Sequence, residues 1–252
     1  MNKPFLSLLI VFSLSGFSLA QTNEFHEEYK YRVDFLFIPS LDITMKISCP
    51  TQFQKKNVKM LEFYTRTKKV FNHIFQINNY YKSVYDSNNF SIFYSEKIIE
   101  QPNVRQTLTA NYGDTLVKYS NKKSLTLPKN THNFFSLLMH LRKINIEEME
   151  KQSFPVDIEG HLYEARFKYL EEDIIVVGNK GILTDKIEIT LFALNPDQPA
   201  VTELTDVFNW KIASNKGKRK IWIEKNKPRR IIKTEFYLSP TWLTAKLVEY
   251  EK

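Results

Sequence analysis

Apolar and polar side chains alternate along much of this chain, a pattern typical of β-strands that bury one face. The clearest case is the segment from Leu41 to Ile47, in which Leu41, Ile43, Met45 and Ile47 alternate with polar residues. About a dozen such segments are predicted as strands. The others are residues 29–37, 60–67, 75–85, 90–94, 104–112, 115–119, 162–170, 186–194, 207–213, 220–224, 230–238 and 242–250.

One central segment follows the helical period instead. Four large apolar residues recur there at i, i+3, i+4 and i+7, the stripe of an amphipathic helix: Phe134, Leu137, Leu138 and Leu141. We expect this helix over about residues 131–143, with Asn130 or Thr131 as its N-terminal cap. A short second helical turn is expected within residues 146–151.

Together these patterns predict a mainly β fold with one inserted helix. A sheet of this width must curl or close. We therefore expect one domain over residues 21–252, a single curved, half-open antiparallel β-barrel with the amphipathic helix against its concave side.

Residues 1–20 have the three parts of a secretory signal peptide. Lys3 supplies the positive region, a mostly apolar stretch follows, and Ser18-Leu19-Ala20 places small residues before a cleavage site at Gln21. The apolar stretch is short and rich in serine, which favours cleavage over a membrane anchor. We expect an exported protein that is soluble in the periplasm or cell envelope after cleavage.

The chain is basic, with a net charge of +8, and removal of Lys3 lowers this by one. A positive charge favours anionic partners such as a membrane or glycan surface, and export makes nucleic acid the least expected of them. Cys49 is the only cysteine, so it has no internal disulfide partner, and we expect it to be buried and inert.

Few residues suggest catalysis, a metal or a cofactor. On one helix, His132 and His140 would lie about 12 Å apart, too far for one metal ion. Capping or surface roles are expected for the histidines. The sequence has no G-x-S-x-G turn, no HExxH motif and few glycines, so we expect a protein that is not an enzyme and has no cofactor.

The strongest local charge is the basic hairpin, residues 216–230. It could contact an anionic surface through five side chains: Lys218, Arg219, Lys220, Arg229 and Arg230. It could also be a charged hairpin that keeps edge strands from pairing with neighbouring molecules, and the alternation supports this interpretation, since Ile221 and Ile223 still mark an inward face.

Aromatic residues make up 14% of the chain. In a barrel they fill the core or line a cavity for an apolar ligand, and the sequence leaves both possibilities open.

The order of these features resembles a known family. The resemblance rests on Tyr85-Asp86 within SVYD, on Leu141-Arg142 at the end of the helix, and on the closing strands at residues 221–236 and 243–250. It covers about residues 25–250 and is to the exported bacterial proteins known as domain of unknown function 3108. The resemblance implies a fold similar to the half-barrel carriers that escort lipoproteins or lipids across the periplasm. It implies no catalytic residues.

Two functions follow from the sequence. The first is non-enzymatic binding of a hydrophobic or lipid-like ligand, with Phe134, Leu137, Leu138 and Leu141 lining the cavity. The alternative is an envelope interaction module that docks on an anionic surface through the basic hairpin.

Overall fold

A computed structural model describes residues 25–35, 38–53, 55–71, 76–199, 201–202, 206, 217–238 and 241–251. The expected signal peptide, residues 1–20, and the expected strand at residues 207–213 lie outside this part of the chain.

The first group of strands is an antiparallel meander from the N-terminal half. Its strands are β1 (Phe25–Phe35), β2 (Ile38–Ser48), β3 (Thr51–Phe53), β4 (Lys56–Thr67), β5 (Asn78–Asp86), β6 (Ile92–Gln101), β7 (Val104–Tyr112), β8 (Leu116–Tyr119) and β9 (Ser124–Thr126). A 3₁₀ turn, Lys69–Phe71, follows β4. Each strand pairs with its neighbour in the chain, except that β2 pairs with β4 while β3 adds a short hairpin to β4.

The second group of strands is a meander from the C-terminal half. Its strands are β10 (Phe154–Ile158), β11 (His161–Val177), β12 (Lys180–Ala193), β13 (Arg219–Glu224), β14 (Ile231–Leu238) and β15 (Thr241–Glu251). The two meanders join through β1 and β15, which pair antiparallel from Glu28↔Glu251 to Phe35↔Leu243. All the described strands therefore form one sheet.

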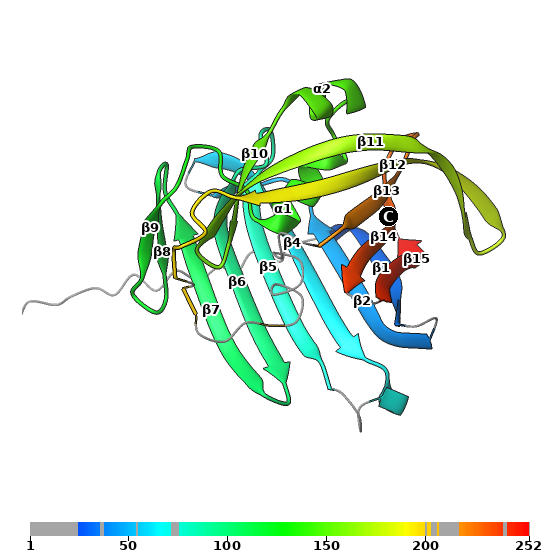
Figure 1. Cartoon of the computed structure of the whole chain (residues 1–252), viewed down its shortest axis with the longest axis horizontal. Coiled ribbons are helices and arrows are strands. Elements are labelled where there is room, and N and C mark those ends of the chain that lie inside the picture. Colours follow the sequence, from blue (N-terminus) through cyan, green and yellow to red (C-terminus); the bar gives the residue numbers. More distant parts are fainter. Residues whose placement is uncertain are drawn as a thin grey trace, which may run out of the picture.

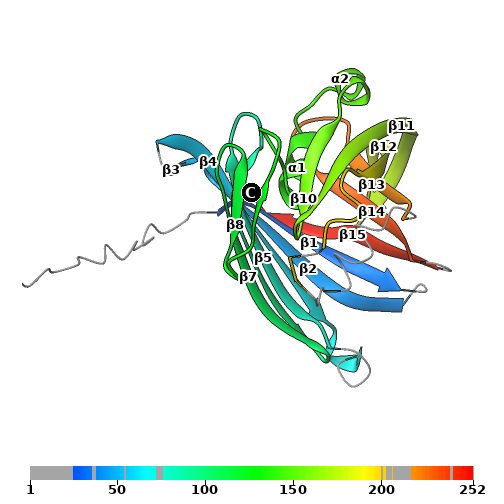
Figure 2. The ribbon, with the colours of Figure 1, turned by 60° about the vertical axis from the view of Figure 1, so that its left-hand side comes forward.

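Two helices connect the meanders: α1 (Phe134–Leu141) and α2 (Ile146–Lys151). Figures 1 and 2 show α1 on the concave side, between the β5–β8 strands and the β10–β13 strands. Its N-terminal cap is Asn133, which accepts a hydrogen bond from the Ser136 amide at 2.8 Å. The prediction of a cap at Asn130 or Thr131 was wrong, because a turn at residues 129–130 and a β-bridge from His132 to Val156 precede the helix.

The sheet curls without closing. Among the described strands, β9 and β10 stand at the two ends of the strand order and share no ladder. The extended segment before α1 bridges part of the gap. The Ile92 amide donates to the Thr131 carbonyl at 2.9 Å, and the His132 amide donates to the Pro155 carbonyl at 2.8 Å. The predicted half-open antiparallel barrel with an inserted helix is therefore confirmed.

The main core fills the space between α1 and the concave face. Inward residues of β1 and β2, such as Val33 and Ile43, meet Leu137 and Leu141 of the helix and Ile187 and Ile221 of the second meander. These side chains alternate along their strands with less buried residues, as the sequence pattern predicted. Neither described helix is long and apolar enough to cross a membrane.

The sequence reading of the strands missed three short elements and part of one hairpin. Strands β3, β9 and β10 were not predicted, and each has five residues or fewer. The hairpin of β11 and β12 is longer than predicted, because it extends to the pair Val177↔Lys180. Apolar residues there lie on both faces of the ribbon: Ile174 and Val176 are exposed, whereas Ile175 is buried. The two-residue period is therefore weak in this segment.

Candidate functional site

An apolar hollow lies on the concave side between α1 and the sheet. Its volume is about 60 Å³, and side chains from β1, β2, β4, β5, α1, β14 and β15 line it. Besides two tyrosines, Thr234 is the only residue of this lining that has a polar side chain. The Tyr31 hydroxyl donates a hydrogen bond to the Ile231 carbonyl at 3.1 Å. The hollow therefore presents rings and aliphatic side chains and has few hydrogen-bonding groups.

Aromatic side chains form one wall of the apolar hollow. The ring of Phe135 lies 5.1 Å from that of Phe63 and 5.2 Å from that of Tyr81, and Phe134 contacts Phe236 at 6.3 Å. Phe63, Phe135 and Phe236 are only partly buried.

The structure brings two of the four predicted cavity residues to the hollow. Phe134 and Leu138 line it. Leu137 and Leu141 are completely buried in the main core instead, and they fix α1 to the sheet. Phe135, which lies outside the predicted stripe of the helix, also lines the hollow.

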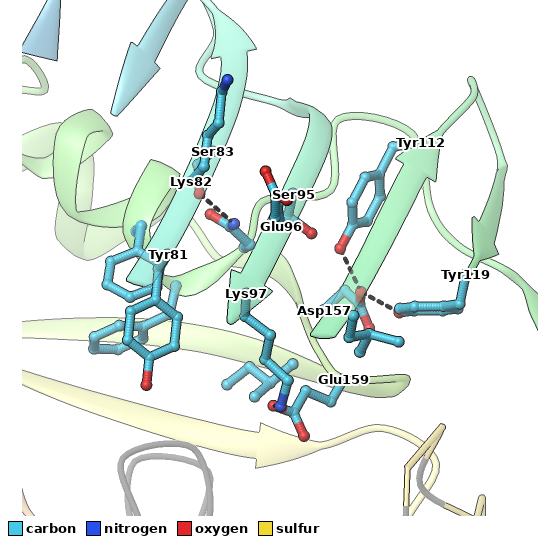
Figure 3. A pocket seen from close by; sticks show the side chains of 15 residues that line it. Tyr81, Lys82, Ser83, Ser95, Glu96, Lys97, Tyr112, Tyr119, Asp157 and Glu159 are labelled. Carbon is cyan, nitrogen blue, oxygen red and sulfur yellow. Dashed lines mark hydrogen bonds and ion pairs between the residues drawn. The ribbon is translucent and has the colours of Figure 1, made fainter. Parts of the chain in front are cut away.

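A second, more polar hollow of about 70 Å³ lies beside the first (Figure 3). Asp157 of β10 is 2% exposed, and its Oδ2 accepts hydrogen bonds from Tyr112 at 2.8 Å and Tyr119 at 2.5 Å. Its Oδ1 accepts the Gly160 amide at 2.9 Å. These bonds tie β10 to β7 and β8, so they hold the two open ends of the sheet together.

Burial sets the protonation of this cluster. It raises the pKa of Asp157, and it raises the pKa of Tyr112 and Tyr119 far above their usual value. Both phenols therefore remain donors at neutral pH. Gly160 is required beside them, because its φ is +88° and a Cβ there would lie 2.2 Å from the Val201 side chain.

A buried ion cluster forms the far side of the polar hollow. The Lys97 ammonium contacts the Glu159 carboxylate and lies 3.7 Å from Oδ2 of Asp206. All three side chains are at most 10% exposed. No sequence motif marks these residues, but Lys97 does lie on the inward face of β6 with Ile99.

The two histidines are the largest departure from the sequence interpretation. His132 Nε2 and His140 Nδ1 lie 3.1 Å apart, and the rings stack at 5.2 Å. The expected separation of about 12 Å was wrong, because His132 precedes α1 and bridges to Val156 of β10. Burial, with His140 beside it, lowers the pKa of His132 to about 4, and burial also lowers the pKa of His140.

The histidine pair belongs to an aromatic stack. Phe90 lies 4.9 Å from the His140 ring and 5.8 Å from the Tyr85 ring, and Phe154 meets both histidines edge-on. Nowhere in the described part of the chain do three metal-ligating side chains gather. The pair therefore acts in packing rather than as a surface or capping feature.

Arg142 fixes the C-terminal end of α1. It is 5% exposed, and its guanidinium donates to Glu27 Oε2 at 2.7 Å, to the Tyr29 hydroxyl at 3.1 Å and to the Arg229 carbonyl at 3.0 Å. One side chain thus joins the helix to β1 and to the turn between β13 and β14. The Leu141-Arg142 pair therefore has a structural role.

Of the five predicted side chains of the basic hairpin, only Lys218 is fully exposed to solvent. Arg219 is 1% exposed, and burial lowers its pKa to about 10. Arg230 forms two 2.7 Å bonds with Glu224, and Arg229 lies 3.5 Å from Asp185. Lys218 is exposed and Lys220 is half-buried over the Trp242 ring.

The edge-protection interpretation of the basic hairpin was wrong. Strand β13 pairs with both β12 and β14, so it is an interior strand. The signal was present in the sequence, because Arg219 has the same parity as Ile221 and Ile223 and so shares their inward face. Cys49 also differs from expectation, since it is exposed rather than buried.

A third recess, of about 270 Å³, opens at the rim beside the turn after β5. Exposed charged residues, among them Lys56, Asp114 and Lys129, line it together with Phe93. Its walls keep contact with water, so it is a poorer site for an apolar ligand than the concave hollow.

Comparison with solved structures supports the fold. A β-barrel-like protein of domain of unknown function DUF1849 from Brucella abortus aligns with 89% of this chain and 96% of its own, with a TM-score of 0.54 and 11% identity. A candidate exported protein with a YmcC-like fold from Bacteroides fragilis aligns with 91% of this chain and 97% of its own, with a TM-score of 0.40 and 6% identity.

Among curated proteins, none matches the sequence. The sequence does match, over residues 30–244, the family described as a protein of unknown function, DUF3108. That range runs from β1 into β15 and includes α1, the polar hollow and the whole lining of the apolar hollow except Ala245. The resemblance found in the closing strands and in the helix is confirmed, and the chain belongs to the DUF3108 family.

Proposed function

We propose that this protein is an exported, non-enzymatic envelope protein that binds a hydrophobic or lipid-like ligand in the apolar hollow. The observation that carries the proposal is the lining of that hollow, which combines apolar side chains from seven elements with one threonine. Concave, mostly apolar sites with few polar groups are typical of ligand pockets. The leader-like sequence at residues 1–20 supports export.

The size of the apolar hollow limits what it holds as it stands. About 60 Å³ accommodates a short alkyl segment, not a whole lipid. A longer chain would need the partly buried rings of Phe63, Phe135 and Phe236 to move. We expect loading to turn these rings outward while Leu137 and Leu141 keep the helix in place.

Binding of the dye N-phenyl-1-naphthylamine to the mature chain tests the proposal, because its fluorescence rises in apolar surroundings. Leu138→Glu places a charge in the hollow and Ala245→Leu fills it, and both should reduce dye binding at least tenfold. Leu183→Glu, on the exposed face of β12, is the matched control and should bind as the wild type does.

Thermal unfolding of each variant shows whether the fold survives. Undiminished binding by a folded Ala245→Leu variant would sink the proposal. If the wild type binds no dye, charge reversal at Lys218 and Lys220 then tests docking on anionic vesicles, the alternative function.

A further inference from the structure

The apolar and polar hollows share one wall. Tyr81, Phe134 and Phe135 line both. Among the described residues, these three aromatic side chains are the ones common to both linings, and Phe135 is partly buried. A ligand chain in the apolar hollow that displaced Phe135 would therefore have its end beside the polar hollow.

The two hollows differ in chemistry on either side of this wall. The apolar side has aliphatic and aromatic groups from β1, β2 and β15. The polar side has the hydroxyl of Ser95 together with Asp157, Glu159 and Lys97. An amphiphile likewise has an apolar chain and a polar head.

The charge of the polar hollow is opposite in sign to that of the chain. Lys97 faces the carboxylates of Glu159 and Asp206. The other charged residues that line the polar hollow are two acids, Asp157 and Glu96, and one base, Lys82, so acidic groups outnumber basic ones. The whole chain carries +8. Local groups decide recognition in a buried site, because water does not screen them there.

We propose that the ligand is an amphiphile whose head donates hydrogen bonds and carries no negative charge, with its chain in the apolar hollow and its head beside Glu159 and Lys97. This inference rests on the proposed function. A hydroxyl or ammonium head would donate to the carboxylate oxygens of the polar hollow. A carboxylate or phosphate head would lose its hydration beside a group of residues in which acids outnumber bases.

The test is a series of ligands with one tail and three heads. Dodecanoate, monododecanoylglycerol and dodecylammonium are titrated into the mature protein at pH 7.4 by calorimetry, each below its micelle concentration. We expect the glycerol and ammonium compounds to bind at least tenfold more tightly than dodecanoate.

A variant tests whether the polar hollow causes the preference for heads without a negative charge. Glu159→Gln removes one negative charge and should narrow the gap between dodecanoate and monododecanoylglycerol by at least fivefold. Glu249→Gln, an exposed residue of β15, is the matched control and should leave the gap unchanged. If Glu159→Gln does not fold, the wild-type series alone decides the inference.

The outcomes separate this inference from the proposed function. Equal affinity for all three compounds, or tighter binding of dodecanoate, overturns the inference and leaves ligand binding in the apolar hollow standing. Failure of all three compounds to bind, together with failure of the dye, overturns both.

Discussion

The two ends of α1 are attached to the sheet by different chemistry. At its N-terminal end the contact is neutral, since Asn133 donates to the Ser83 hydroxyl at 2.7 Å. His132, just before the helix, meets His140 of the last helical turn at 3.1 Å. At its C-terminal end the contact is charged, since Arg142 is buried against Glu27 at 2.7 Å.

The two ends of α1 should therefore differ in how much stability is lost when their contacts are broken. A buried ion pair is costly to break from one side, because the remaining charge stays without its partner. Neutral hydrogen bonds cost less to lose, and protons can titrate the histidines. Phe134 and Phe135, which line the hollows, lie at the neutral end. We therefore expect the Arg142 end to act as the fixed anchor and the Asn133 end as the adaptable one.

The largest effect is expected at the anchor. Arg142→Met should lower the free energy of unfolding by about 3–5 kcal/mol, because it leaves the Glu27 carboxylate without its cationic partner and the Arg229 carbonyl without its donor. Urea denaturation measures this loss. Lys143→Met, at the exposed neighbouring position, is the control and should change stability by less than about 1 kcal/mol. If Arg142→Met and Lys143→Met lose similar unfolding free energy, Arg142 is not the anchor of the helix.

The next effect depends on pH and belongs to the neutral end. The pKa of His132 is about 4 in the folded protein and 6.5 in the unfolded chain, so above pH 6.5 both states hold it neutral. As the pH falls from about 6.5 to about 4, the unfolded chain takes up a proton that the folded one excludes. The free energy of unfolding should fall by about 3 kcal/mol over this window.

The difference between wild type and His132→Gln isolates this contribution, because Asp157, whose raised pKa acts in the opposite direction, is common to both. Urea denaturation at a series of pH values should show a flatter acid limb for the variant. His26→Gln, at an exposed position, should follow the wild type. Parallel curves for wild type and His132→Gln would show that the histidine pair is not held neutral.

The smallest effect is expected at the helix cap. Asn133→Ala removes the bonds to Ser136 and Ser83 and should lower the free energy of unfolding by about 1–2 kcal/mol. Asn145→Ala, at the cap of the exposed helix α2, offers a comparison and should cost less than about 1 kcal/mol. A larger loss at Asn145 would mean that burial does not strengthen the α1 cap.

The elements that could be predicted from the sequence are those with a regular period. Strand β2 and helix α1 repeat every two and every 3.6 residues, and both lie close to their expected positions. The distal half of the β11–β12 hairpin has apolar residues on both faces, so alternation could not mark it.

The site could be predicted only in part. Phe134 and Leu138 share the helical stripe and do line the apolar hollow. The polar hollow could not be predicted, because Asp157 and Tyr119 are 38 residues apart in the sequence and no local pattern encodes their contact. The contact between His132 and His140 could not be predicted either, because it depends on the residue at which α1 begins.

The pairing of β1 with β15 has a consequence for folding. Lys30 and Glu249 are 219 residues apart and lie 3.2 Å from each other, whereas almost every other ladder joins consecutive strands. Long-range ladders close late, since they carry the largest loop entropy. Until β15 has been synthesised, β1 and β14 each keep one unpaired edge, which leaves the growing chain open to mispairing with other strands. We therefore expect completion of the sheet, and with it of the concave face that forms the candidate site, to be a late step of folding.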